Sequence, residues 1–272
     1  MEKNLLEMHM LKRLIAVIIV ILMCCAGCNA PTYPKEKFVE SLKDICKKEY
    51  QVDAQAKLVG KTLVVFLPLE ELFDEKMEIL PGAIDKIEKV ITAASRIIFS
   101  TDAEVSFFTV VAADIKTTAA ELILIKYVED VHRLINSWIS QDEYRRRILW
   151  QINFNPKHLN SAAYDFNVEE LTLPVFLARQ IAQRLNFASE NSGYSKVRIT
   201  GEYIEQEKLF FFSLITAEKN KFFETFSPDI LREAALVLSS YKFEDFNGVE
   251  VRNLLNNESV TIEKKELNNY LK

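Results

Sequence analysis

Apolar residues recur at two different spacings along this chain, and the change between them limits the folds that the chain can adopt. Phe38, Leu42, Ile45 and Cys46 are spaced as on one face of a helix. Residues 52–58 instead alternate apolar and polar side chains, which is typical of a strand with one buried face. Strands covered on both faces would be mostly continuous apolar runs. We therefore expect an α+β fold in which helices pack on mainly antiparallel sheets.

The predicted elements follow the same order in both halves of the chain: helix, strand, strand, helix, strand and strand. In residues 37–152 they are a helix over 37–50, strands over 52–58 and 63–67, a helix over 84–98 after Pro81 and Gly82, strands over 105–113 and 121–126, and two further helices over 127–139 and 141–152. In residues 169–272 they are a helix over 173–188, strands over 195–204 and 208–216, a helix from the N-cap Ser227 and Pro228 to Tyr241, and strands over 248–255 and 259–263. Residues 153–168 are predicted to be a polar linker. No residue-level repeat accompanies this order, so two similar α-β-β-α-β-β halves are expected from the order alone.

An uncharged apolar run from Leu14 to Gly27 precedes this body. It has 14 residues, whereas a helix that crosses a bilayer needs about 20. Basic residues at 12 and 13 come before the run and small residues end it, which is the order of a secretory signal peptide. Acids at positions 2 and 7 suit that role poorly, so Met8 or Met10 is an alternative start to Met1. An uncleaved membrane anchor is the other reading of the run.

The end of the run, Cys25-Ala26-Gly27-Cys28, resembles the lipobox of bacterial lipoproteins. The resemblance covers about the first 30 residues and implies a diacylglycerol on the Cys28 sulfur, cleavage between Gly27 and Cys28, and further acylation, for example by palmitate. Residues 1–27 would then be a signal peptide and residues 28–36 a linker behind the lipid anchor. Cys25 departs from the lipobox pattern, because leucine is usual three residues before the modified cysteine. In lipoproteins of enteric bacteria, an aspartate after the modified cysteine retains the protein in the inner membrane. Asn29 stands at that position here, so the resemblance allows an outer-membrane location, on the periplasmic side of the cell envelope.

Cysteine use agrees with export of a chain without disulfides. After removal of residues 1–27 and lipidation of Cys28, only Cys46 is left, and one thiol cannot form an intramolecular disulfide. We expect Cys46 to be a buried, inert thiol on a helix.

Several kinds of chemistry are excluded or unsupported by the composition. The glycines after residue 28 are all at least eight residues apart, so neither a Walker loop, nor a dinucleotide fingerprint, nor a serine-hydrolase elbow can form. Two histidines and Cys46 are too few for a structural zinc site, and we expect no cofactor and no metal. Without residues 1–27 the chain has 31 basic and 37 acidic side chains, a net charge of −6, which argues against nucleic acid as a partner. Arg145-Arg146-Arg147 is expected to be a solvated helix face.

Five groups of residues were weighed as functional candidates. Glu129 and His132 have the spacing of a carboxylate–histidine metal half-site, but no second such pair exists, so a helix-surface pair is favoured. His158 has no visible partner. Trp138 and Trp150 are expected in the core. We expect Phe210 and Phe212 on one face of a strand and Phe211 on the other. Together with Phe222, Phe223 and Phe226, these side chains form either part of the core or an exposed aromatic patch.

The expected function is that of a cell-envelope lipoprotein, anchored at Cys28, whose non-enzymatic body binds or scaffolds another envelope component. An envelope protein and the membrane are the expected partners. The alternative is a lipid-anchored hydrolase that uses a pair of carboxylates, since such chemistry needs only two acids at a suitable separation. No catalytic residue can be named from the sequence.

Overall fold

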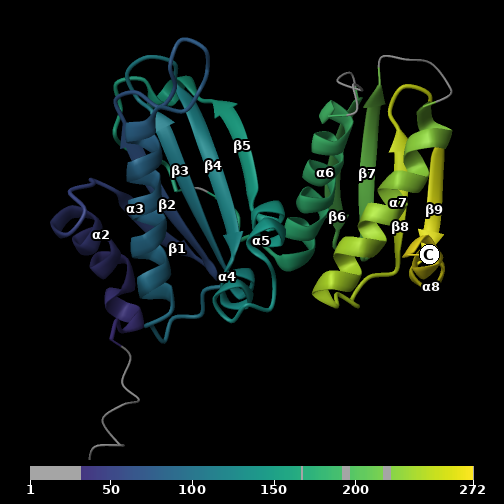
Figure 1. Ribbon diagram of the computed structural model, residues 1–272, viewed down its shortest axis with the longest axis horizontal. Helices are drawn as coiled ribbons and strands as arrows, with labels where there is room; N and C mark the ends of the chain where they lie inside the picture. The colour runs from purple at the N-terminus through teal and green to yellow at the C-terminus, as the bar shows by residue number, and fades with distance from the viewer. Residues whose placement is uncertain (1–31, 167, 192–196, 217–221, 272) are drawn as a thin grey trace, which may run out of the picture.

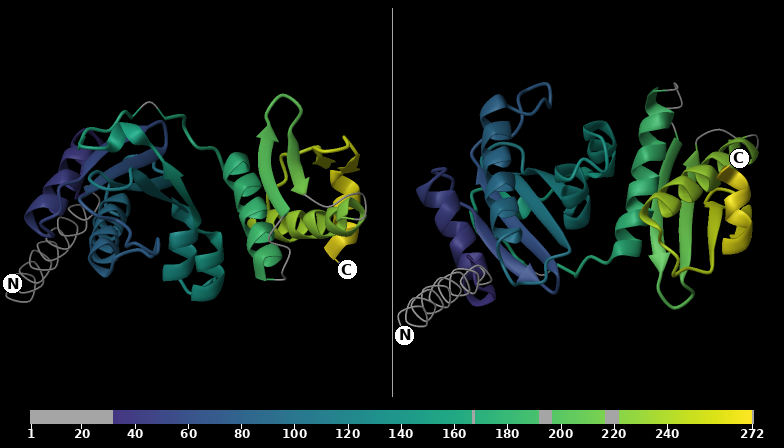
Figure 2. Two further views of the ribbon diagram at one scale, coloured as in Figure 1. Left: turned by 90° about the horizontal axis from the view of Figure 1, so that it is seen from above. Right: turned by 60° about the horizontal axis from the view of Figure 1, so that its bottom comes forward.

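The computed structural model describes residues 32–166, 168–191, 197–216 and 222–271, which form two sheets with helices packed on them (Figure 1). The predicted signal peptide and the lipid attachment residue Cys28 lie outside the described residues. Figure 2 shows the two halves side by side, with α6 at the junction.

The first half is built around a five-stranded sheet in the order β1-β2-β3-β4-β5. Only β2 and β3 are parallel, since the helix between them returns the chain to the same end of the sheet. Its elements are the short 3-10 helix η2 (Lys35–Lys37), α2 (Phe38–Lys48), β1 (Gln55–Val59), β2 (Thr62–Leu69), α3 (Pro81–Ile98), β3 (Phe107–Asp114), β4 (Ala120–Tyr127), α4 (Val128–Ile135), α5 (Gln141–Arg147), β5 (Leu149–Phe154) and the 3-10 helix η3 (Pro156–His158).

The second half repeats this scheme with a four-stranded sheet in the order β6-β7-β8-β9. Again the second and third strands, β7 and β8, are parallel and the other neighbours are antiparallel. Its elements are α6 (Leu173–Asn191), β6 (Val197–Ile204), β7 (Leu209–Thr216), α7 (Phe222–Tyr241), β8 (Gly248–Asn253), β9 (Ser259–Glu263), α8 (Lys264–Leu267) and the 3-10 helix η4 (Asn268–Leu271).

The α+β prediction is confirmed, and so is the repeated order of elements. The predicted helix over 141–152 is wrong beyond Arg147, because Ile148 is extended and residues 149–154 pair with β4 as strand β5. The predicted helix start at Ser227 is also wrong. Helix α7 begins at Phe222, so Ser227 is a buried residue within the helix, and Pro228 lies inside it rather than at its first position.

Three apolar clusters hold the fold together. The first lies between sheet one and the helices α2 and α3. The second lies between sheet two and the helices α6 and α7, and it extends to Phe107, Ile125 and Leu149 of sheet one, so one core spans both halves. The third covers the other face of sheet one, where Tyr164 and Phe166 pack on Phe66 and its neighbours.

Two backbone contacts define how elements approach one another. Gly201 of β6 allows α6 to lie directly on the strand, because a Cβ at Gly201 would stand 2.2 Å from the carbonyl oxygen of Ala178. At the start of the described chain, Tyr33 forms a β-bridge with Thr101, and its N–H donates to the carbonyl of Ser100 at 3.1 Å. The chain therefore enters half one beside the end of α3.

Candidate functional site: a groove between the two halves

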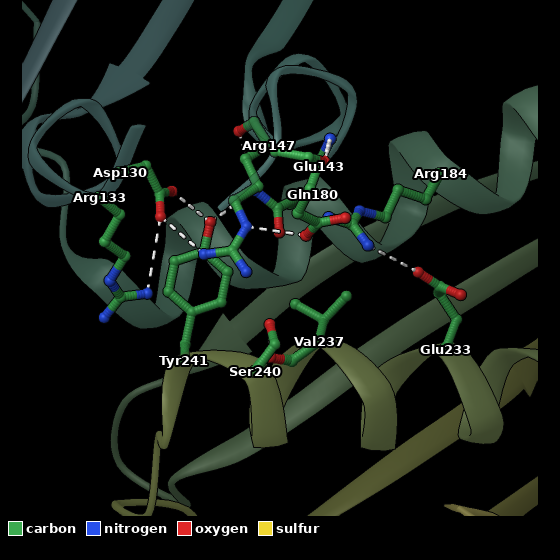
Figure 3. A network of polar contacts seen from close by, with 11 residues as sticks. Asp130, Arg133, Glu143, Arg147, Gln180, Arg184, Glu233, Val237, Ser240 and Tyr241 are labelled. Carbon is green, nitrogen blue, oxygen red and sulfur yellow. Dashed lines mark hydrogen bonds and ion pairs between the residues drawn. The ribbon is translucent and has the colours of Figure 1, made fainter. Parts of the chain in front are cut away.

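A buried polar cluster joins the halves where α4 and α5 meet α6 and α7 (Figure 3). At its centre the Arg147 guanidinium donates to Asp130 at 2.7 Å and to Glu143 at 2.8 Å. The hydroxyl of Tyr241, from the other half, donates to the second oxygen of Asp130, and the guanidinium lies over the Tyr241 ring at 4.5 Å from its centroid. One tyrosine therefore meets both members of an ion pair that belongs to the opposite half.

Burial and charge set the ionisation of this cluster. Burial raises the pKa of Tyr241, and the Asp130 carboxylate raises it further. Burial also raises the pKa of Asp130, against the hydrogen bonds from Tyr241 and Arg147. Burial opposes the ionised form of Glu143 too, but Arg147 and Arg184 outweigh it and hold the pKa of Glu143 below its usual value.

Two side chains of α6 complete the cluster. The Gln180 amide donates to the carbonyl of Arg147 at 2.8 Å and to the hydroxyl of Tyr241 at 3.1 Å. Arg184 bridges Glu143 and Glu233, at 3.0 and 3.3 Å, so α5, α6 and α7 are tied together. Because each carboxylate already faces an arginine, the cluster acts as a clamp that sets the position of one half on the other.

A groove of about 580 Å³ lies between the halves, beside this clamp. Its volume falls in the range of about 300–1,000 Å³ that is usual for ligand sites. One wall is formed by β4 and β5, and the other by α6 and the first part of β6. The indole of Trp150 and the ring of Phe187 meet across it, with their centroids 5.3 Å apart.

The charged lining of the groove is basic. Arg179 of α6 and Arg198 of β6 line it together with Glu190. Within the part of the chain that the structure describes, neither arginine has an ion-pair partner, in contrast to Arg184 on the same helix. An anionic group in the groove would meet two guanidinium groups without displacing an existing salt bridge.

A second buried polar group lies outside the groove lining, on the face of sheet one to which the groove residue Ile123 also belongs. His158 is buried, and its Nε2 lies 3.0 Å from both Glu121 and the Asn155 amide, while its ring lies against Phe66 and Tyr164. The sequence shows no partner for His158, and the structure supplies Glu121 and Asn155. Glu121 precedes it by 37 residues, so the pairing is visible only when β4 and η3 are brought together.

The structure corrects several other predicted positions. Trp138 is 71% exposed and Trp150 is 43% exposed, so neither belongs to the core, since α4 ends at Ile135 and Trp150 lies on an edge strand. Arg145 and Arg146 are exposed as predicted, but Arg147 is buried because it reaches back to Asp130. Cys46 is buried and free, and burial raises the pKa of its thiol to about 11.

The remaining candidates fall into the apolar core or the surface. Phe210, Phe212, Phe223 and Phe226 are buried in the core of half two, whereas Phe211 faces the other side of the sheet beneath the Arg252 guanidinium. The side chain of Phe222 lies outside the described residues.

Glu129 and His132 do not form a pair. Glu129 lies 3.5 Å from Arg133, and the His132 ring lies edge-on to Phe99. Among the described residues, no group of three or more His, Cys, Asp or Glu side chains is arranged to hold a metal ion. In the same part of the chain, no helix combines the length and apolar character that a membrane crossing needs.

Comparison with known proteins gives no match: no protein-family model, curated protein or solved structure resembles this chain closely enough to be identified. Apart from Trp150, which was expected in the core, the groove residues were not predicted from the sequence. The alternation of Leu149, Gln151 and Asn153 with larger apolar residues is a strand signal that was available, but nothing local distinguishes Gln183 or Arg198 from other surface residues.

Proposed function

We propose that this protein is a cell-envelope lipoprotein, anchored through lipid on Cys28, whose body binds another envelope component in the groove between its halves. The observation that supports binding is the groove itself, with aromatic side chains and two arginines that have no described ion-pair partner. The clamp of Asp130, Arg147 and Tyr241 supports it further, because walls held in fixed positions reduce the entropy cost of binding.

The groove favours binding over the alternative of carboxylate catalysis. Glycoside hydrolysis uses two carboxyl groups on either side of the scissile bond. Among the described residues that line the groove, Glu190 supplies the only carboxylate. The two acids of the neighbouring clamp, Asp130 and Glu143, are already paired with arginines.

Metabolic labelling with an alkyne fatty acid tests the anchor. The wild-type chain should be labelled, and Cys28→Ala should abolish the labelling. Cys25→Ala should leave labelling intact, since Cys25 is expected to leave with the signal peptide. Persistent labelling of Cys28→Ala would reject the anchor.

Site-specific photocrosslinking tests the groove. A photoreactive amino acid at Phe187, inside the groove, should form an adduct in intact cells that is lost when Arg198→Glu is introduced. The control position is Ile84 of α3, which has a similar exposure, 42% against 37%, but does not line the groove. Equal adducts at both positions, or adducts that do not depend on Arg198, would contradict the binding role.

A further inference from the structure

One edge of the sheets differs from the other three. The edge strands β1, β6 and β9 each contain a charged residue, respectively Lys57, Arg198 and Glu263, whereas β5 contains none. Charges on edge strands are a common means of preventing a further strand from adding. Strand β5 instead exposes Trp150, Ile152 and Phe154, all on one face.

The hydrogen-bond pattern shows which main-chain groups of β5 point away from the sheet. The N–H of Asn155 donates to the carbonyl of Ala119, its antiparallel partner, so Asn155 and every second residue before it point toward β4. The N–H and C=O groups of Trp150, Ile152 and Phe154 therefore point outward. In the described part of the chain, no residue forms a hydrogen bond to the outward groups of Ile152 or Phe154.

The side-chain amide of Gln183 already occupies the beginning of this edge. Its oxygen accepts from the N–H of Trp150 at 2.9 Å, and its nitrogen donates to the carbonyl of Ile148 at 2.8 Å. A primary amide has the same donor and acceptor as a peptide group, so Gln183 makes contacts there that a neighbouring strand would make. Beyond Gln183 the edge opens into the groove, which Gln151 and Ile152 line.

We infer that the groove binds an extended, acidic peptide segment of a partner protein, which adds to β5 as a sixth strand. This inference rests on the binding role proposed for the groove. The outward groups of Ile152 and Phe154 pair with the main chain of the segment, its apolar side chains contact Trp150 and Phe187, and its carboxylates meet Arg179 and Arg198. A second copy of this chain fits poorly, because α6 and β6 stand beside β5 and leave a groove rather than an open edge.

The test uses the full chain in detergent micelles and a fluorescent seven-residue peptide of alternating valine and glutamate, blocked at both ends. Fluorescence polarisation should show that this peptide binds at least tenfold more tightly than the matched valine–lysine peptide. N-methylation of alternate peptide bonds removes main-chain donors and should weaken binding at least tenfold. Equal binding of methylated and unmethylated peptides would overturn strand addition.

A pair of variants tests the edge itself. Ile152→Ala and Ile152→Pro both remove the side chain, but only proline removes the outward N–H, and proline is tolerated at such edge positions. The Ile152→Pro chain should bind the valine–glutamate peptide at least tenfold more weakly than the Ile152→Ala chain, and equal binding would contradict the inference. If Ile152→Pro does not fold, the methylated peptide gives the same information.

The outcomes separate this inference from the proposed function. Loss of the peptide preferences with retention of the Arg198-dependent adduct at Phe187 would reject strand addition and leave the binding groove. Loss of both would reject the groove as a binding site. Sedimentation of the chain without peptide tests whether a second copy binds instead. Dimers that are lost in Phe154→Lys but kept in Leu255→Lys, a position of equal exposure, would reject the peptide in favour of a second copy.

Discussion

The two halves share six elements in the same order and with the same pairing, but they continue differently after the sixth. Half one continues from β4 into α4, α5 and β5. Half two continues from β9 into the short α8, where Leu267 is buried in its own core. The three additional elements of half one supply Asp130, Arg147 and the exposed edge beside the groove. The shared scaffold thus gives the fold, and the addition provides the interface and the candidate site.

A closer comparison shows that the shared parts agree even in their turns. Five residues join β3 to β4 and five join β8 to β9. Both turns follow a buried residue with an Asx side chain, Asp114 in half one and Asn253 in half two. Each accepts the N–H of the residue two positions later, at 3.1 and 3.0 Å. Only Asp114 can carry a charge, which gives the halves different responses to acid.

The largest effect is expected when the joint between the halves is broken. Arg147→Ala removes the closer cationic partner of the buried Asp130 and leaves only Arg133, at 3.6 Å, and loss of one member of a buried ion pair costs about 3 to 5 kcal/mol. Urea unfolding followed by tryptophan fluorescence should show this loss. Arg145→Ala is the matched control, because the Arg145 side chain on the same helix is 66% exposed, and it should change the free energy of unfolding by about 0.5 kcal/mol or less. Equal losses in the two variants would show that the clamp does not hold the halves.

A second prediction concerns helix–strand packing inside half two. Gly201→Ala should cost about 2 to 3 kcal/mol, because the new methyl group would overlap the carbonyl of Ala178 and force α6 away from β6. Gly82→Ala in α3 meets no atom within 4 Å and should be neutral or stabilise by about 0.5 to 1 kcal/mol. Thermal unfolding of both variants measures the contrast. A similar melting temperature for the two would mean that α6 does not need its close approach.

Acid should affect half one through Asp114. Burial opposes its charge, but hydrogen bonds from Thr117, Lys116 and Thr118 lower its pKa to about 2. A lowered pKa adds stability above the ordinary pKa near 4, and this stability is lost as the pH falls through 2. Asp114→Asn should therefore cost about 2 kcal/mol at pH 7, and the difference from wild type should vanish near pH 2. Unfolding free energies measured from pH 2 to 7 test the slope; a difference that does not depend on pH would contradict it.

The smallest effect is expected at the start of α5, which only half one possesses. The Ser140 hydroxyl accepts the N–H of Glu143 at 3.1 Å as an N-cap. Ser140→Ala should cost about 1 kcal/mol in thermal or urea unfolding, whereas Ser140→Asn, which preserves the cap, should cost little. Equal losses would indicate that the helix is positioned by the clamp alone.

The parts of this structure that follow from local spacing were accessible from the sequence. The stripe from Phe38 to Cys46 and the alternation before Leu58 predict α2 and β1, and similar patterns predict most later elements. Strand β5 was missed although its residues alternate, because six residues directly after a helix are too few to separate a strand from a continuation of that helix. Pairing with β4 makes these residues a strand, and that contact joins segments that are not adjacent in the sequence.

The candidate site was less accessible for the same reason. Asp130, Arg147, Gln180 and Tyr241 come from four helices that span more than 100 residues, so no spacing along the chain predicts their meeting. Arg147 is the clearest example. It belongs to a run of three arginines that looks like a solvated surface, and burial of one of them depends on a carboxylate 17 residues earlier.

With the proposed lipid on Cys28, the β-bridge between Tyr33 and Thr101 would limit the distance between this end of half one and the membrane. Tyr33 is five positions after Cys28, and a fully extended chain of five steps spans at most about 17 Å. A lipid on Cys28 would thus be a short tether, which keeps the part of half one around Tyr33 and Thr101 close to the bilayer surface.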